Sequence, residues 1–148
     1  MAWFSRFDRF GSAHMVRSQD RDMSCGMSSV CMINFKMKKG LMFAGMAAGA
    51  GLSTVPVPGA SYLGATLFRS AIDYAVASEN EVIALYERVE GGPHDFNTAG
   101  ADPSLYPQVL ADLGLGEWER VDVGEDGIVR ACIDATADGS PVMVGLSW

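Results

Sequence analysis

Cysteine and histidine are scarce in this sequence, whose 148 residues include three cysteines and two histidines. Three cysteines at irregular spacing form neither a metal-binding set nor an even disulfide framework, which favours reduced thiols. A glycine-rich phosphate loop placed between a strand and a helix is also missing. The sequence therefore predicts no metal, no nucleotide or flavin cofactor, and synthesis in the cytoplasm.

A secretory signal is missing too, because MAWFSRFDRF lacks an apolar core of sufficient length. We expect a cytoplasmic protein, or one that is secreted without a cleaved signal peptide. The composition, 49% hydrophobic and 20% charged, is typical of a single globular domain, here residues 1–148. Residues 70–148 hold three Lys or Arg and fifteen Asp or Glu, and this acidic balance disfavours nucleic acid as a partner.

Charge is absent altogether from residues 41–68, which are rich in Gly, Ala and Pro. The length would suffice for a membrane span, but five glycines together with Pro56 and Pro58 would interrupt one continuous helix. We therefore expect no membrane span. The segment predicts a short helix, a turn at PVPG and an apolar lead into the next helix, as an insertion in the domain.

The N-terminal part of the sequence predicts a short strand followed by a buried helix. Residues 1–24 have the character of a terminal arm packed on the domain, in which HMVRSQ can form a strand. In residues 26–38 apolar side chains occupy nearly all faces, which is typical of a buried helix. Three lysines close this helix favourably against its dipole, and Gly40 is predicted as its C-cap.

Two helices are predicted in the middle of the chain. Ser78 and Glu81 form a capping box for a helix that extends to Glu90 and stops at GGP. A polar loop follows over residues 94–101. Ser104 is then predicted to cap a helix that tolerates proline in its first turn and ends at a glycine.

The C-terminal part predicts two strands on either side of a helix. Residues 118–123 and 141–148 alternate in polarity as strands do. Asp126 is predicted to cap the helix between them, with its apolar side chains, Ile128, Val129, Cys132 and Ile133, turned inward. Because helices precede strands along the chain, we expect an α+β fold rather than a βαβ repeat.

Gln19 and Cys25 carry the clearest chemistry in the sequence. Cys25 is expected in the first turn of the buried helix, where unpaired N–H groups and the helix dipole favour a reactive thiolate. The Gln19 carboxamide and the Cys25 N–H can donate hydrogen bonds to the oxyanion that forms when the thiolate attacks a carbonyl. Gly26 removes side-chain bulk beside the attacked carbon. Cys31 and Cys132 lie within apolar helical patterns and are predicted to be core residues.

The segment RSQDRDMSCGM resembles the active-site opening of papain-like cysteine peptidases. With Asp22 and the Cys25-Gly26 pair it is most similar to the bacterial peptidases that trim double-glycine leaders, and to related bacterial effectors. The resemblance implies a papain-like α+β fold, in which the nucleophile helix is followed by an antiparallel sheet. It also implies a thiol hydrolase that cleaves peptide or isopeptide bonds in a bacterial export or effector setting.

The resemblance leaves the general base unassigned. In the family, a strand of the PVMVGLSW type leads into a glycine-histidine turn, and no residue up to Trp148 matches that position. One explanation is a truncated chain, whose base and remaining strands lie beyond Trp148. The other is that His94 serves as the base from its polar loop.

The sequence is therefore compatible with three functions. The first is the peptidase, with a peptide or protein as its partner. The second is a non-catalytic peptide-binding module with a degenerate papain-like fold, since a thiolate without a basic partner is a poor catalyst. The third, ranked below both, is a membrane-inserting, toxin-like role for residues 41–68.

Overall fold

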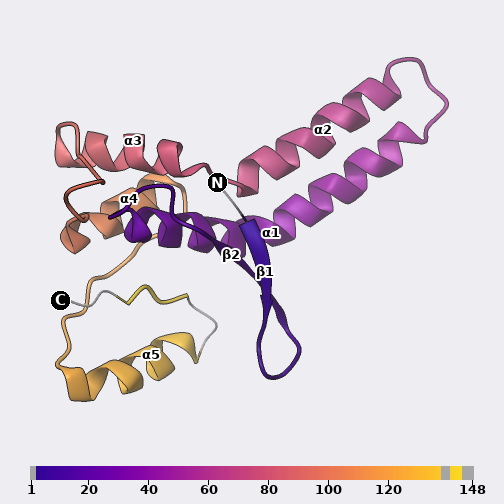
Figure 1. Ribbon diagram of the computed structural model, residues 1–148. Helices are drawn as coiled ribbons and strands as arrows, with labels where there is room; N and C mark the ends of the chain where they lie inside the picture. The colour runs from indigo at the N-terminus through magenta and orange to yellow at the C-terminus, as the bar shows by residue number, and fades with distance from the viewer. Residues whose placement is uncertain (1–2, 138–140, 145–148) are drawn as a thin grey trace.

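The computed structural model describes residues 3–137 and 141–144, with the side chain of Glu125 excepted. Its elements follow in the order β1 (Trp3–Phe7), β2 (Ala13–Arg17), α1 (Cys25–Ser53), α2 (Ala60–Ala75), α3 (Glu79–Glu90), the 3-10 helix η1 (Pro103–Leu105), α4 (Tyr106–Asp112), η2 (Glu125–Gly127) and α5 (Ile128–Thr136). Figure 1 shows α3, α4 and the first half of α1 grouped together, and the second half of α1 projecting with α2. The predicted α+β class is confirmed.

The sheet of the described residues is an antiparallel hairpin at the N-terminus. Its register pairs Trp3 with Arg17 at one end and Phe7 with Ala13 at the other. The strand predicted at HMVRSQ is thus confirmed as β2, and its partner β1 comes from the aromatic residues at the start of the chain. The order along the chain differs from the prediction, because the described strands precede the helices.

Helix α1 is much longer than predicted. It runs from Cys25 through Gly40 to Ser53, so the predicted end at Gly40 is wrong. A glycine ends a helix where the chain needs a left-handed residue, and here the helix continues because its second half packs against α2. Tertiary packing outweighs the local stop signal.

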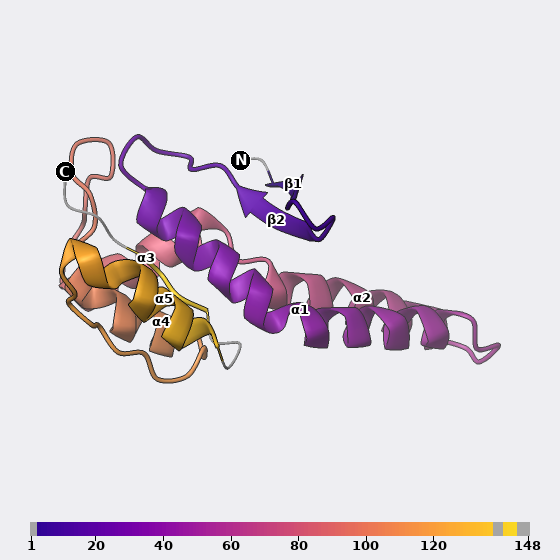
Figure 2. The ribbon, with the colours of Figure 1, turned by 90° about the horizontal axis from the view of Figure 1, so that it is seen from below.

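Residues 41–68 form most of an antiparallel helical hairpin, with the predicted turn at PVPG between α1 and α2. Figure 2 shows the two helices side by side and extending away from the rest of the molecule. They approach closely because glycines face each other: a side chain at Gly49 would place its Cβ 2.6 Å from the Gly64 carbonyl oxygen. No helix in the described part of the chain is long and apolar enough to cross a bilayer.

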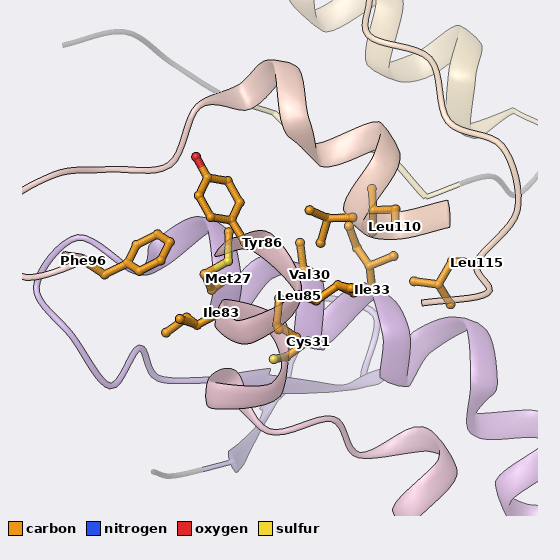
Figure 3. Close-up of a cluster of buried hydrophobic side chains, with 12 residues drawn as sticks. Met27, Val30, Cys31, Ile33, Ile83, Leu85, Tyr86, Phe96, Leu110 and Leu115 are labelled. Atoms are coloured by element: carbon orange, nitrogen blue, oxygen red, sulfur yellow. The ribbon is translucent and has the colours of Figure 1, made fainter. Parts of the chain in front are cut away.

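The core lies where the first half of α1 meets α3 and α4, as Figure 3 shows. Its buried members are Met27, Val30, Cys31, Ile33, Val82, Ile83, Leu85, Tyr86, Phe96, Val109, Leu110 and Leu115. The predictions of a buried first helix and of Cys31 as a core residue are confirmed.

The predicted capping box of α3 is confirmed. The Ser78 side chain accepts a hydrogen bond from the Glu81 N–H, and the Glu81 carboxylate accepts one from the Ser78 N–H. Gly91 ends the helix with a φ of 90°, a conformation that favours glycine. The next predicted helix is also present as α4, but its cap is different, because the Asp102 carboxylate accepts the Ser104 N–H and starts η1 first.

The C-terminal predictions are mostly wrong. Residues 118–123 form no strand, and neither do 141–144, while 145–148 lie outside the described residues. An alternating segment becomes a strand only when a neighbouring strand pairs with it. Helix α5 is present, but Gly127 rather than Asp126 occupies its N-cap. Two of the side chains predicted to point inward are exposed, Val129 by 69% and Ile133 by 61%, while Ile128 and Cys132 are half-buried.

One buried carboxylate joins four segments of the fold. Glu79, in the first turn of α3, is fully buried and accepts the Asp20 N–H at 3.1 Å and the Ser28 hydroxyl at 2.7 Å. The Arg17 guanidinium, also buried, lies 3.5 Å away and donates a hydrogen bond to the Asp20 carboxylate. The end of β2, the following loop, α1 and α3 therefore meet at Glu79.

Removing this carboxylate should strongly destabilise the protein. Glu79→Ala removes one of the two carboxylates that face the buried Arg17 guanidinium, together with the acceptor of the buried Ser28 hydroxyl. Breaking a buried ion pair in this way typically costs about 3–5 kcal/mol of unfolding free energy. Urea denaturation measures the loss. Glu117→Ala, at an exposed position, is the matched control and should change stability by less than about 0.5 kcal/mol. Equal stability of the two variants would contradict the role of Glu79.

Close packing within the helical hairpin predicts opposite effects for two glycine substitutions. Gly64→Ala would place a methyl group 2.5 Å from the Gly49 carbonyl oxygen and 2.7 Å from the Ser53 nitrogen, so the helices must separate. Gly51 has open space around it, so Gly51→Ala should stabilise its helix by about 0.5–1 kcal/mol. Hydrogen exchange of the α2 amides should accelerate in the first variant and not in the second. Unchanged exchange in Gly64→Ala would rule out this packing.

Candidate active site at the start of helix α1

Cys25 is the first residue of α1, and its side chain is exposed. The preceding residue, Ser24, does not cap the helix with its side chain, because its hydroxyl donates to the Arg21 carbonyl at 2.9 Å and accepts the Arg21 N–H. The first turn also contains no acidic side chain. The N–H groups of the first turn therefore face no capping or acidic side chain of that turn, and their partial positive charge lies next to Cys25.

Gln19 is exposed in the loop of residues 18–24, which connects β2 to α1. Its amide nitrogen donates a hydrogen bond to the Asp22 carbonyl at 2.8 Å. Among the described residues, no hydrogen bond joins Gln19 to Cys25. A carboxamide nitrogen carries two hydrogens, so one remains for another acceptor. The structure thus places Gln19 and Cys25 on the same junction between the loop of residues 18–24 and α1, without a hydrogen bond between them.

The loop of residues 18–24 is fixed at both of its ends. The Asp20 N–H is held by the buried Glu79 carboxylate. The Met23 N–H donates to the Phe96 carbonyl at 2.8 Å, which ties the loop to the segment after α3. Ser28 on α1 donates to Glu79 as well, so the same carboxylate holds the loop and the helix that carries Cys25.

The space beside Gly26 differs from the expectation. It was expected to be open for substrate, but Gly26 is buried under the ring of Tyr106 from α4, and a Cβ at position 26 would overlap the Tyr106 hydroxyl. Gly26 therefore makes room for Tyr106. Burial raises the pKa of the Tyr106 phenol, and negative charge at Cys25 raises it further.

Tyr106 is the functional candidate that the sequence did not indicate. Its raised pKa keeps the hydroxyl protonated at neutral pH, so a hydrogen-bond donor stands near the Cys25 thiol. Sequence spacing gives no signal for the packing of Tyr106 on Gly26, since the two residues are far apart in the chain. The only local hint is an aromatic residue at the start of a helix.

His94 lies in the loop after α3 and is half-buried. Its Nδ1 is 3.0 Å from the Glu90 carboxylate and its Nε2 is 3.3 Å from the Ala99 carbonyl oxygen. The imidazole also packs against the rings of Phe96, at 4.4 Å between centroids, and Tyr86, at 5.4 Å. Both nitrogens face acceptors, and no hydrogen bond reaches Cys25 within the described residues. This geometry favours a structural role for His94.

The second histidine, His14, is exposed on β2, and its Nε2 lies 3.1 Å from the Asp8 carboxylate. The described residues also contain no group of three or more His, Cys, Asp or Glu that could hold a metal ion. His14 therefore provides no base beside Cys25, and the described residues provide no metal site there.

An open groove of about 780 Å³ lies beside α1. It is lined by side chains of β2, α1 and residues 141–144, among them Met15, Met32, Phe35, Phe43 and Val142. Neither Cys25 nor Gln19 contributes to its walls, but Ser29 does, and its hydroxyl donates to the Cys25 carbonyl at 2.9 Å. The groove therefore begins one helical turn after the candidate nucleophile.

Comparison of the chain with family models, with curated proteins and with solved structures finds no match. The assignment of a function therefore rests on the chemistry of the site itself.

Proposed function

We propose that this protein is a thiol hydrolase of papain-like type, in which Cys25 attacks the carbonyl of a peptide or isopeptide bond in a bacterial export or effector setting. The observation that carries the proposal is the exposed Cys25 thiol at the uncapped start of a buried helix. Gln19, held in the loop immediately before that helix, supports it.

In the proposed reaction, the Cys25 sulfur forms a bond to the carbonyl carbon and the carbonyl oxygen becomes an oxyanion. The Cys25 N–H and the second hydrogen of the Gln19 carboxamide donate to that oxygen. The carbon–nitrogen bond then breaks and the leaving amine takes the equivalent of the proton that the Cys25 thiol lost. Water hydrolyses the thioester, which releases the acyl group as a carboxylic acid and returns the thiol. The proton requires an acid, and no described histidine contacts Cys25.

The second candidate is a non-catalytic, peptide-binding module with a degenerate papain-like fold. Both ring nitrogens of His94 are engaged by acceptors, which favours this alternative. Turnover of a fluorogenic peptide library separates the two functions. Turnover that Cys25→Ala abolishes supports the hydrolase. Peptide binding that survives in Cys25→Ala, without turnover by the wild type, supports the module.

Cys25 should be the most reactive of the three thiols. Cys31 is fully buried and burial raises its pKa to about 12, so it remains a protonated thiol near neutral pH. Cys132 is half-buried within α5. Brief iodoacetamide treatment at pH 7, followed by peptide mass mapping, should modify Cys25 first. Cys25→Ser is the control that should remove this early label, and faster labelling of Cys132 would contradict the proposal.

Removing the His94 ring should leave the reactivity of Cys25 unchanged. His94→Ala loses ring packing on Phe96 and Tyr86, which should lower the unfolding free energy by about 1 kcal/mol. The rate of Cys25 alkylation between pH 6 and pH 9 measures its effect on the thiol, with His14→Ala as the matched control. If His94 were the base, hydrolysis would fall by about 10²-fold and the pH profile would shift. That result would reassign the catalytic base to His94.

A further inference from the structure

The hairpin of α1 and α2 exposes a large apolar surface that the proposed chemistry does not use. Its exposed large apolar side chains are Leu41, Phe43, Leu52, Val55, Val57, Tyr62, Leu63, Leu67 and Phe68. They lie on both helices and on the turn between them, on the part that projects from the molecule in Figure 2. Exposed apolar side chains gathered on one projecting element often mark a site of contact with a partner or a membrane.

Three of the five hydroxyl groups of this hairpin are satisfied within their own chain segments. Ser53 donates to the Gly49 carbonyl at 2.9 Å, Thr54 to the Gly51 carbonyl at 2.8 Å, and Thr66 to the Tyr62 carbonyl at 2.9 Å. A polar group inside hydrocarbon must find its partner in the protein, because no water is present. These three hydroxyls meet that requirement, and the other two, of Ser61 and Tyr62, are exposed on α2. The two helices also pack through small residues, a contact that does not depend on water.

Three exposed cations lie along the hairpin, two at its base and one part-way along α2. Gly45 packs against Ala71 and Gly49 against Phe68, so Arg69 lies opposite residues 47–48 of α1. Lys36 and Lys39 are exposed on α1, and Arg69 is exposed on α2. Lys38 is half-buried and donates to the Leu113 carbonyl, and the exposed Asp73 is the acidic residue at this end of α2. Cations outnumber the acid, and such clusters next to an apolar segment are attracted by anionic lipid headgroups.

The length of the hairpin suits one leaflet of a bilayer. The uncharged part of α2 before Arg69, residues 60–68, has nine residues, and at about 1.5 Å per residue it is about 14 Å long. One leaflet contributes about 15 Å of hydrocarbon, half of a core of about 30 Å. The part of the hairpin between Arg69 and the turn therefore matches the depth of one leaflet.

We propose that residues 48–68 insert as the tip of a helical hairpin into one leaflet of an anionic lipid bilayer, with Arg69 at the headgroups and Lys36 and Lys39 on the aqueous side. A second copy of the chain would cover one face of the hairpin, whereas lipid covers both helices and the turn. Cys25 stands about 23 residues before this boundary on the same helix, so the candidate site is held about 35 Å from the membrane surface. The insertion itself does not depend on the proposed chemistry of Cys25.

Flotation with lipid vesicles tests the proposal on the full chain. Wild-type protein should float with vesicles of phosphatidylcholine and phosphatidylglycerol at 3:1, and at least tenfold less with phosphatidylcholine alone. The double variant Val57→Asp/Leu63→Asp, which charges positions 59% and 62% exposed at the tip, should lose binding at least tenfold. Val129→Asp, at a position 69% exposed on α5, is the matched control and should bind like the wild type. Cys25→Ser should also float normally, which separates lipid binding from thiol chemistry.

A second double variant keeps the test decisive if the first one misfolds. Lys36→Glu/Arg69→Glu should reduce the preference for anionic vesicles at least tenfold without touching the apolar tip. A wild type that stays with the aqueous phase in all vesicle mixtures would overturn the proposal. So would light scattering that shows a dimer without lipid which the tip substitutions dissociate, since the hairpin would then bind a second copy.

Discussion

The Glu79 carboxylate is the contact on which the arrangement of the other elements depends. It is fully buried and binds the loop after β2 through the Asp20 N–H, α1 through Ser28, and the end of β2 through Arg17. A buried charge pays a large desolvation cost, so such a site is stable only when several partners converge on it. Their convergence brings the loop of residues 18–24 to the start of α1, which is where Gln19 and Cys25 lie.

Helix α1 connects two parts of the molecule that are held together by different kinds of packing. Its first half is buried among α3 and α4, and its second half contacts α2 alone among the described elements. The change occurs at the lysines around residue 38, where the chain passes from core packing to the close contact of small residues. One continuous helix therefore forms part of both the core and the projecting apolar hairpin. The proposed active site and the proposed lipid-binding surface occupy its opposite ends.

The candidate site has the features of a nucleophile more clearly than those of a complete catalyst. Cys25 is exposed at a helix start without an acidic neighbour in the first turn, and the protonated Tyr106 hydroxyl lies close by. Proton transfer needs a group that can accept and release a proton at this position. The described histidines are engaged elsewhere, His14 with Asp8 and His94 with Glu90. An exposed thiol without a described histidine beside it is compatible with both proposals, hydrolysis and peptide binding.

Local signals in the sequence determined the elements whose hydrogen bonds close within a few residues. The capping box of Ser78 and Glu81, the turn at PVPG and the start of α1 at Cys25 belong to this group. Only the tertiary structure decided the features that depend on distant partners. Gly40 did not end α1 because α2 packs beside its continuation, and residues 118–123 form no strand because no neighbouring strand pairs with them. Tyr106 reaches Gly26, and Glu79 reaches Asp20, across long separations in sequence, and contacts of that kind leave no periodic pattern in the residues that make them.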